Sequence, residues 1–234
     1  GSDVFRMYLG FGFAYTEGGP WSDDGLKAIS RFVGRIERLV DGIAEARGSS
    51  GAPADRASAP SAEKILGAAA SSADKELNYM RNVAIKGVTE DVERFQFNTS
   101  IARLMELINA LYKYDGAGKN SAVYMDTVTD FLKLLAPFAP HLAEELWEKM
   151  GYPYSIFNRK WPVWDEKALV RDETEIGIQL NGKIKEKIML SSGLDKAQTE
   201  EAVMKDKKIT AMLAGKTVVK VIAVPGKLVN IVVK

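Results

Sequence analysis

The spacing of apolar residues predicts helices over most of the first two thirds of the chain. The first clear helix begins after Pro20 and Trp21, because Ser22 can cap it and Asp23 and Asp24 suit the positive end of a helix dipole. Its apolar positions recur at helical spacing and form one stripe: Ile29, Phe32, Val33, Ile36, Leu39, Val40 and Ile43. We therefore expect this helix to bury one face against neighbouring helices.

Further helices follow, and one long loop interrupts the series. Residues 48–62 are rich in Gly, Ser, Ala and Pro, a composition that predicts a flexible loop. Beyond it we expect helices at Glu63–Lys86, Thr89–Tyr114, Ser121–Leu135 and Pro140–Gly151, the last opened by a proline in its first turn. Helices of this kind with short connections predict an antiparallel helical bundle.

The pattern changes to that of β-strands in the last quarter of the chain. Between residues 176 and 190, apolar and polar residues alternate on both sides of Asn181-Gly182, a dipeptide that favours a hairpin turn. A helix is expected over 195–214, and the β-branched runs Thr217–Val224 and Leu228–Val233 predict a second hairpin. The chain is therefore expected to be mainly α, with a helical bundle followed by a small α+β domain of ββαββ order.

These patterns divide the chain into four parts. We expect a leading segment at 1–20, the helical bundle at 21–161, a linker at 162–173 and the small domain at 174–234. A short linker with few contacts permits relative motion of the domains that it joins.

Composition narrows the possible chemistry. The 234 residues include no cysteine, which excludes disulfides, thiolate metal sites and a cysteine nucleophile. The single histidine, His141, favours a structural role near the helix of Trp147 over metal binding or base catalysis. The sequence has no Gly-rich phosphate loop, no signal peptide and no apolar stretch that would span a membrane. We therefore expect no metal site and no catalytic residue in this chain.

Positive charge is gathered in the tail. The whole chain carries a net charge of +1, but residues 171–234 hold 12 Lys and Arg against 8 Asp and Glu. Lys183, Lys185 and Lys187 alternate along one predicted strand, so we expect them to share one face of the sheet. Such a row suits RNA phosphates, and it equally suits the protection of a sheet edge against aggregation.

The first predicted helix carries three arginines on a more exposed face: Arg31, Arg35 and Arg38. They suit phosphate groups, because arginine forms charge-assisted hydrogen bonds with them. An ordinary solvated face paired with Glu37 fits the same spacing equally well.

Several segments together resemble leucyl-tRNA synthetases of the bacterial type. In the leading segment, Asp3–Leu9 resembles the stretch that follows the Lys-Met-Ser-Lys-Ser signature of that family. In the expected bundle the similar segments are Trp21–Gly25, Val88–Ile101 and Leu104–Tyr112. Another segment, 136–147, is shared with the valyl, isoleucyl and methionyl enzymes. The tail segments are more specific and favour the leucyl enzyme: Ile178–Lys183 and Val221–Val232.

The resemblance implies a parent enzyme that uses ATP and Mg²⁺ to attach leucine to its tRNA. The family's His-x-Gly-His and Lys-Met-Ser-Lys-Ser signatures are absent from this sequence, so we expect the chain alone to be catalytically inactive and to need no cofactor. The implied partners are leucine tRNA and the missing catalytic and editing domains of the same polypeptide. A cytoplasmic monomer that does not bind membranes is expected.

The resemblance also bears on the candidate tRNA contacts. Its motifs mark Asn181, Lys183, Lys227 and Asn230, to which we add Lys185, Lys187 and the three arginines. The two asparagines fit turn and sheet-end hydrogen bonds equally well. Two alternatives to this function are the same region of a valyl, isoleucyl or methionyl enzyme, and a protein-interaction scaffold that does not bind RNA. The scaffold predicts an exposed apolar groove and no salt-sensitive RNA affinity.

Overall fold

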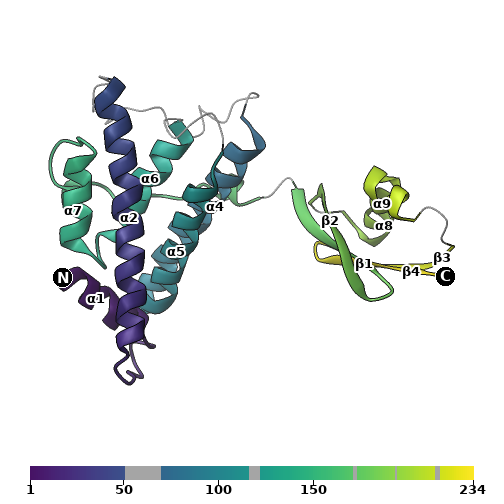
Figure 1. Ribbon diagram of the computed structural model, residues 1–234, viewed down its shortest axis with the longest axis horizontal. Coiled ribbons are helices and arrows are strands. Elements are labelled where there is room, and N and C mark those ends of the chain that lie inside the picture. The colour runs from purple at the N-terminus through teal and green to yellow at the C-terminus, as the bar shows by residue number, and fades with distance from the viewer. Residues whose placement is uncertain (51–69, 116–121, 171–172, 193, 214–216) are drawn as a thin grey trace. The chain divides into compact units, whose positions relative to one another are not determined.

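The chain forms two compact units with separate hydrophobic cores. Unit 1 comprises Gly1–Leu169 and unit 2 comprises Val170–Lys234. The computed structural model describes residues 1–50, 70–115, 122–170, 173–192, 194–213 and 217–234 (Figure 1). None of the described helices is long and apolar enough to cross a membrane.

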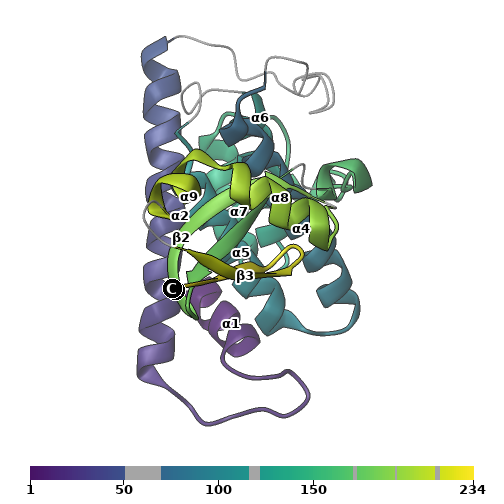
Figure 2. The ribbon, with the colours of Figure 1, turned by 90° about the vertical axis from the view of Figure 1, so that its right-hand side faces the viewer.

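Unit 1 is a helical bundle, as predicted. The long helix α2 stands between α7 and α5 in Figure 1 and runs along the left edge of the bundle in Figure 2, and α1 packs against α2, α5 and α7. The predicted apolar stripe of α2 is buried in the core. The helices of unit 1 are α1 (Ser2–Phe11), α2 (Asp23–Ser50), α4 (Ser72–Glu93), α5 (Phe97–Lys113), α6 (Ala122–Leu135) and α7 (Pro140–Lys149), with 3-10 turns η1 (Ile156–Asn158) and η2 (Glu166–Leu169).

The start of α2 agrees with the sequence prediction. The Ser22 hydroxyl accepts a hydrogen bond from the Gly25 amide at 3.1 Å, which satisfies one of the unpaired amides of the first turn. The other end differs from the prediction, because residues 48–50 continue the helix. The rest of the predicted loop, 51–62, lies outside the described residues.

The predicted break between the second and third helices is in the wrong place. We expected it at residues 87–88, but α4 continues to Glu93. Arg103 of α5 crosses α4 directly over Gly87. A Cβ added at Gly87 would lie 2.5 Å from the Arg103 Cδ and Nε atoms, so glycine leaves the room that this arginine occupies. Arg103 Nε donates to the buried Asp91 carboxylate at 2.7 Å, so this glycine lets the two helices approach and form an ion pair.

The actual end of α4 is a left-handed turn. Phe95 has a φ of 57°, the Gln96 amide donates to Asp91 O at 2.8 Å, and the Phe95 amide donates to Val92 O at 3.1 Å. These paired hydrogen bonds close a helix in the Schellman manner, at a position where glycine is the usual residue. At the other end, Ser71 and Asp74 form a capping box. The part of the predicted helix before residue 70 lies outside the described residues.

The segment after α7 runs along α4. Trp161 Nε1 donates to the Thr89 hydroxyl at 2.8 Å, and the Asp165 amide donates to Asn82 Oδ1 at 2.7 Å. The Lys86 ammonium lies 3.1 Å from the Glu166 carboxylate. Within the range 162–173, which we expected to be a linker, residues up to Leu169 are therefore part of unit 1.

Unit 2 is a four-stranded sheet with helices α8 (Lys196–Lys205) and α9 (Lys207–Met212) packed on one face (Figures 1 and 2). The strand order is β2-β1-β4-β3, in which β1 and β4 pair in parallel and the other pairs are antiparallel. The strands are β1 (Glu173–Leu180), β2 (Lys183–Ser191), β3 (Val218–Val224) and β4 (Leu228–Val233).

The single helix predicted over 195–214 is in fact two helices. Asp206 has an extended backbone, which ends α8. Its side chain accepts hydrogen bonds from the Lys208 and Ile209 amides at 2.8 and 3.2 Å and so begins α9. The predicted capping box of Asp195 and Gln198 at the start of α8 is confirmed.

Candidate nucleic-acid interface

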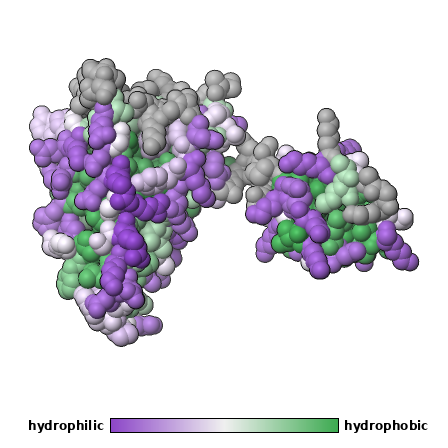
Figure 3. Space-filling view, viewed as in Figure 1, coloured by the Kyte–Doolittle hydropathy of each residue, from purple (hydrophilic) through white to green (hydrophobic). Residues whose placement is uncertain are grey.

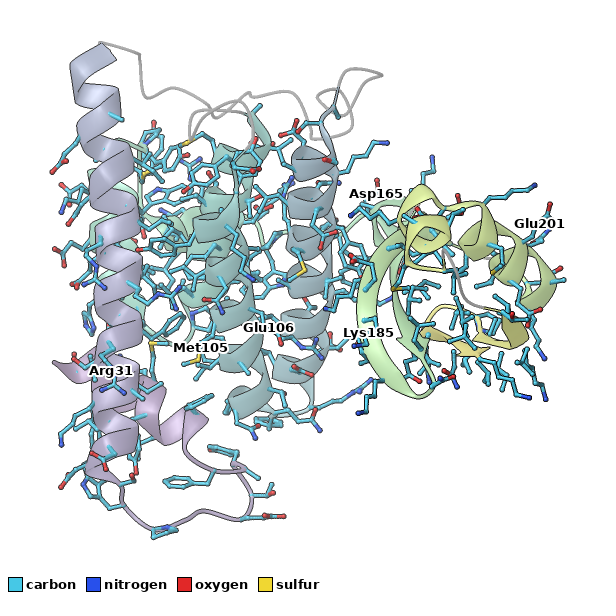
Figure 4. All side chains as sticks on the ribbon, turned by 45° about the vertical axis from the view of Figure 1, so that its right-hand side comes forward. Arg31, Met105, Glu106, Asp165, Lys185 and Glu201 are labelled. Carbon is cyan, nitrogen blue, oxygen red and sulfur yellow. The ribbon has the colours of Figure 1, made fainter. Side chains whose placement is uncertain are left out.

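The three arginines of α2 differ in their surroundings. Arg31 and Arg38 are exposed, and Figure 4 shows Arg31 on the outer side of the helix. Arg35 is half-buried: its Nη2 donates to Asn109 Oδ1 at 2.8 Å, and its guanidinium carbon lies 5.0 Å from the centroid of the Tyr112 ring. Arg35 therefore joins α2 to α5, whereas Arg31 and Arg38 present their charges to solvent.

Asn181 and Asn230 hold unit 2 together. The Asn181 amide group donates to Val233 O at 3.1 Å and accepts from the Val233 amide at 3.0 Å, and Asn230 Oδ1 accepts from the Gly182 amide at 3.0 Å. All three bonds join the β1–β2 turn to β4, because β1 and β4 are neighbours. Asn181 and Gly182 have φ of 49° and 82°, as a two-residue hairpin turn requires. Turn and sheet-end hydrogen bonds thus account for both side chains.

The lysines of β2 do not lie on one face, and this prediction was wrong. Lys183 pairs with Leu180, which lies on the helix-covered face, whereas Lys187 pairs with Gly177 on the opposite face. The register shifts between Ile178 and Gln179, which leaves Lys185 as the extra residue of a β-bulge. A bulge interrupts the strict alternation of side chains. All three lysines are nevertheless exposed, and Figure 4 shows Lys185 on β2.

The face of the sheet opposite α8 and α9 has a mixed surface. Cross-strand pairing places Ile184, Ile222 and Val224 on this face, and Ile184 is 66% exposed. Lys187 and Lys220 belong to the same face by their pairing. Figure 3 shows apolar side chains over the strand side of unit 2 bordered by hydrophilic ones. Our sequence reasoning missed Lys220, because its position on this face depends on the pairing of β3 with β4.

Lys227 lies in the turn between β3 and β4 and is exposed. Gly226 before it has a φ of 70°, and the Lys227 amide donates to Val224 O at 3.1 Å. The Lys227 carbonyl accepts from the Gly177 amide at 3.2 Å, so the backbone of this lysine is fixed while its side chain is exposed.

His141 is an anchor between α7 and α1. Its side chain is 73% exposed, and Nδ1 lies 2.9 Å from Asp3 Oδ1. Asp3 Oδ2 accepts from the Leu142 amide at 2.7 Å, and Arg6 lies 2.6 Å from Oδ1. Burial raises the pKa of Asp3, but the hydrogen bonds from His141 and the Leu142 amide, with the charges of His141 and Arg6, outweigh burial and hold that pKa below its ordinary value.

Metal binding finds no support in the described part of the chain, where no three His, Asp or Glu side chains gather as ligands. What the geometry offers instead is a set of exposed cations: two arginines on α2 and several lysines on and beside the sheet of unit 2. Exposed cations on rigid elements suit a polyanion.

A family model described as the anticodon-binding domain of tRNA ligase matches residues 74–201. The chain belongs to this family. The match covers α4 to α7 of the bundle and continues into α8 of unit 2.

Curated relatives of this anticodon-binding chain are leucine–tRNA ligases. The enzyme of Caldanaerobacter subterraneus subsp. tengcongensis is 51% identical over 235 residues, and that of Clostridium perfringens is 54% identical over 235 residues. Each alignment covers 100% of this chain and 27% of the relative, so the chain spans about a quarter of the length of these proteins.

A solved structure with the same fold is a ternary complex of the Agrobacterium radiobacter K84 agnB2 LeuRS with tRNA and LeuAMS. It matches this anticodon-binding chain with a TM-score of 0.69 and 28% sequence identity, over 100% of this chain and 28% of the other.

Proposed function

We propose that this chain is the tRNA-docking part of a leucyl-tRNA synthetase. In the whole enzyme it helps to hold leucine tRNA while leucine is attached to it with ATP. The observation that carries this proposal is the alignment with leucine–tRNA ligases over 100% of the chain. Because that alignment includes unit 2 as well as the bundle, it favours the leucyl enzyme over valyl, isoleucyl and methionyl relatives.

Phosphate contacts by exposed cations are the proposed mode of binding. Lys183 and Lys227 lie at the hairpin turns of unit 2, Lys185 in the bulge of β2, and Lys187 on the sheet face opposite α8 and α9. Arg31 and Arg38 lie on α2. Contacts of this kind position a structured RNA through its backbone and its shape. Arg35, Asn181 and Asn230 act mainly by fixing the elements that carry these cations.

Catalysis belongs to other domains in this proposal. ATP and Mg²⁺ serve the catalytic domain of the parent enzyme, and an editing domain is a further partner within the same polypeptide. The chain is proposed to work as a monomer in the cytoplasm. Unit 1, Gly1–Leu169, forms the docking bundle, with residues 1–20 nearest the catalytic core in the parent enzyme, and unit 2, Val170–Lys234, forms the small tRNA-binding domain.

A salt series tests the proposal. Leucine tRNA is titrated into the chain from about 50 to about 200 mM salt, a range over which a protein that contacts several phosphates loses affinity steeply, roughly tenfold or more. Binding with that salt dependence supports phosphate-mediated docking. A folded chain that binds no tRNA at the lowest salt contradicts it and favours the scaffold function, which the exposed apolar residues of the unit 2 sheet would then serve.

A further inference from the structure

A second group of basic and aromatic side chains follows α7, outside the candidate contacts described above. Tyr154 is 82% exposed, Phe157 and Lys160 are also exposed, and Arg159 lies between them in sequence. Interleaved cations and rings are typical of surfaces that bind unpaired nucleotides, because rings stack on bases and cations bind phosphates.

Tyr154 combines an unusual backbone conformation with an exposed ring. Its φ of 62° lies in the left-handed region, which is an outlier for a bulky residue and stores local strain. The ring does not gain burial in return, since most of it faces solvent. Backbone strain that keeps a large ring in water points to a role in binding.

Arg159 is fixed beside this ring. Its guanidinium carbon lies 5.8 Å from the centroid of the Tyr154 ring and 5.5 Å from that of Trp147, and its Nη2 donates to the Pro153 carbonyl. Two ring contacts and one hydrogen bond leave this side chain little freedom. A guanidinium that is already ordered loses little entropy when it binds a phosphate.

A pocket of about 160 Å³ opens between α6, α7 and this segment. Its lining includes Lys133, Trp147, Tyr152 and Arg159. Trp147 is 3% exposed, and neither its Nε1 nor Arg159 Nε has a hydrogen-bond partner among the described residues. Buried donors of this kind are costly when unpaired, so a small movement of the pocket lining that brings an acceptor to them would be favourable.

The charge of the pocket favours an anion. The basic lining residues are Lys133 and Arg159, and the acidic one is Asp126, whose carboxylate lies 3.9 Å from Arg81. Lys133 is paired with the buried Asp130 at 3.2 Å, which leaves Arg159 as the lining cation without a carboxylate partner among the described residues. On the same measure one water needs roughly 10–15 Å³, so the pocket has room for a group the size of a phosphate. Tyr154 is not part of the pocket lining, but its ring lies beside Arg159, so a base next to a phosphate bound at Arg159 would be within reach of that ring.

We propose that Tyr154, Arg159 and the pocket beside Trp147 bind one unpaired nucleotide of an RNA, the phosphate at Arg159 and Trp147 and the base on Tyr154. This subsite rests on the proposed tRNA-docking function and names a contact in unit 1 beyond the arginines of α2. Charge complementarity and the prepositioned ring and guanidinium favour RNA over a protein segment as the occupant.

The test compares ring and charge variants of the whole chain in titrations with leucine tRNA. Tyr154→Ala is expected to weaken binding about tenfold, the usual effect of losing one stacked base. Tyr154→Phe keeps the ring and is expected to stay within about twofold of the unmodified chain. Tyr15→Ala is the matched control, because Tyr15 is a 62% exposed tyrosine elsewhere in unit 1. Ultraviolet crosslinking should join the tRNA to the peptide that contains Tyr154.

If the unmodified chain binds tRNA, two outcomes overturn the subsite while the proposed function stands. One is a Tyr154→Ala variant with undiminished tRNA affinity. The other is an equal loss of tRNA affinity in Tyr154→Ala and Tyr15→Ala. If the unmodified chain binds no tRNA, the proposed function and the subsite are overturned together. Arg159→Lys keeps the charge but loses the planar group, and an affinity equal to that of the unmodified chain would remove Arg159 from the site. Thermal melting checks that each variant is folded. The Tyr154 variants change only an exposed ring, so they still test the subsite even if Arg159 proves necessary for folding.

Discussion

Individual lysines of unit 2 project from an edge strand in different directions because of the bulge at Lys185. Lys183 lies at the end of the hairpin and Lys185 in the bulge, and Lys187 lies on the sheet face opposite α8 and α9. Lysines that diverge in this way would each approach a different phosphate of a curved RNA surface, rather than act as one row.

The double variant Lys183→Ala, Lys185→Ala should therefore lower tRNA affinity and also lower its salt dependence. Each lost phosphate contact reduces the slope of log affinity against log salt by about one, so the double variant should reduce it by about two. Titrations across a salt series measure this. The control is Lys196→Ala, Lys205→Ala, which removes two exposed lysines from α8. An unchanged slope in the first variant would exclude both residues from the RNA contact.

Asp3→Asn tests the anchor between α1 and α7. Hydrogen bonds to a charged group contribute about 1.5–3 kcal/mol, so this variant should lose stability of that order near pH 7. Since the folded-state pKa of Asp3 is lowered, its contribution is present above the unfolded pKa of about 3.9 and is lost as the pH falls through the folded value. Denaturant unfolding at several pH values should show the two proteins converging in acid. A constant difference down to the lowest pH would contradict this role for Asp3.

For individual residues, the sequence predicted which positions are important more accurately than it predicted what those positions contact. Asn181 and Asn230 were singled out by motif, but only the parallel pairing of β1 with β4 shows that they bond to each other's segments. The partners of His141 and Arg35 are similarly distant in sequence, at Asp3 and Asn109. Local patterns carry no information about such partners.

Among the elements, the junction of α4 and α5 depends on a single glycine. Alanine in place of Gly87 would improve helix propensity by about 1 kcal/mol. Its Cβ would however displace Arg103, which pairs with the buried Asp91. The loss of a buried charged hydrogen bond outweighs the gain in propensity.

Gly87→Ala should therefore destabilise the chain by about 1 kcal/mol, but stabilise an Arg103→Ala background by about 0.5–1 kcal/mol. Denaturant unfolding of the two single variants and the double variant gives the coupling between the positions. The same sign in both backgrounds would show that Arg103 does not explain the glycine.

Apolar periodicity predicted the existence of the helices well and their ends less well. The stripe of α2 and the proline start of α7 were visible in the sequence, because both are local signals. The continuation of α4 through Gly87 was not, because a side chain from another helix makes the glycine acceptable. Asp206 did carry a readable capping signal, but the helical pattern on both sides of it concealed the break.

For the whole molecule, the two units would contribute to the proposed tRNA docking in two different ways. Unit 1 has a large buried core and carries exposed arginines on a long helix, whereas unit 2 is a small sheet domain with lysines at its hairpins and an open face. The order of a bundle followed by a small α+β domain was predictable from periodicity alone. The function was not, since spacing left RNA binding and a solvated surface equally open, and it is the likeness to leucine–tRNA ligases that supports the proposal of RNA binding.

The most direct test of this account is a competition for the purified chain between leucine tRNA and an unrelated tRNA at fixed salt. Labelled leucine tRNA is bound first, and either unlabelled tRNA is added as competitor. We predict that the unrelated tRNA is needed at a roughly tenfold or higher concentration, which corresponds to about 1.4 kcal/mol of discrimination. Equal displacement by both RNAs would contradict the account, because the binding would then be general attraction to a polyanion rather than docking of leucine tRNA.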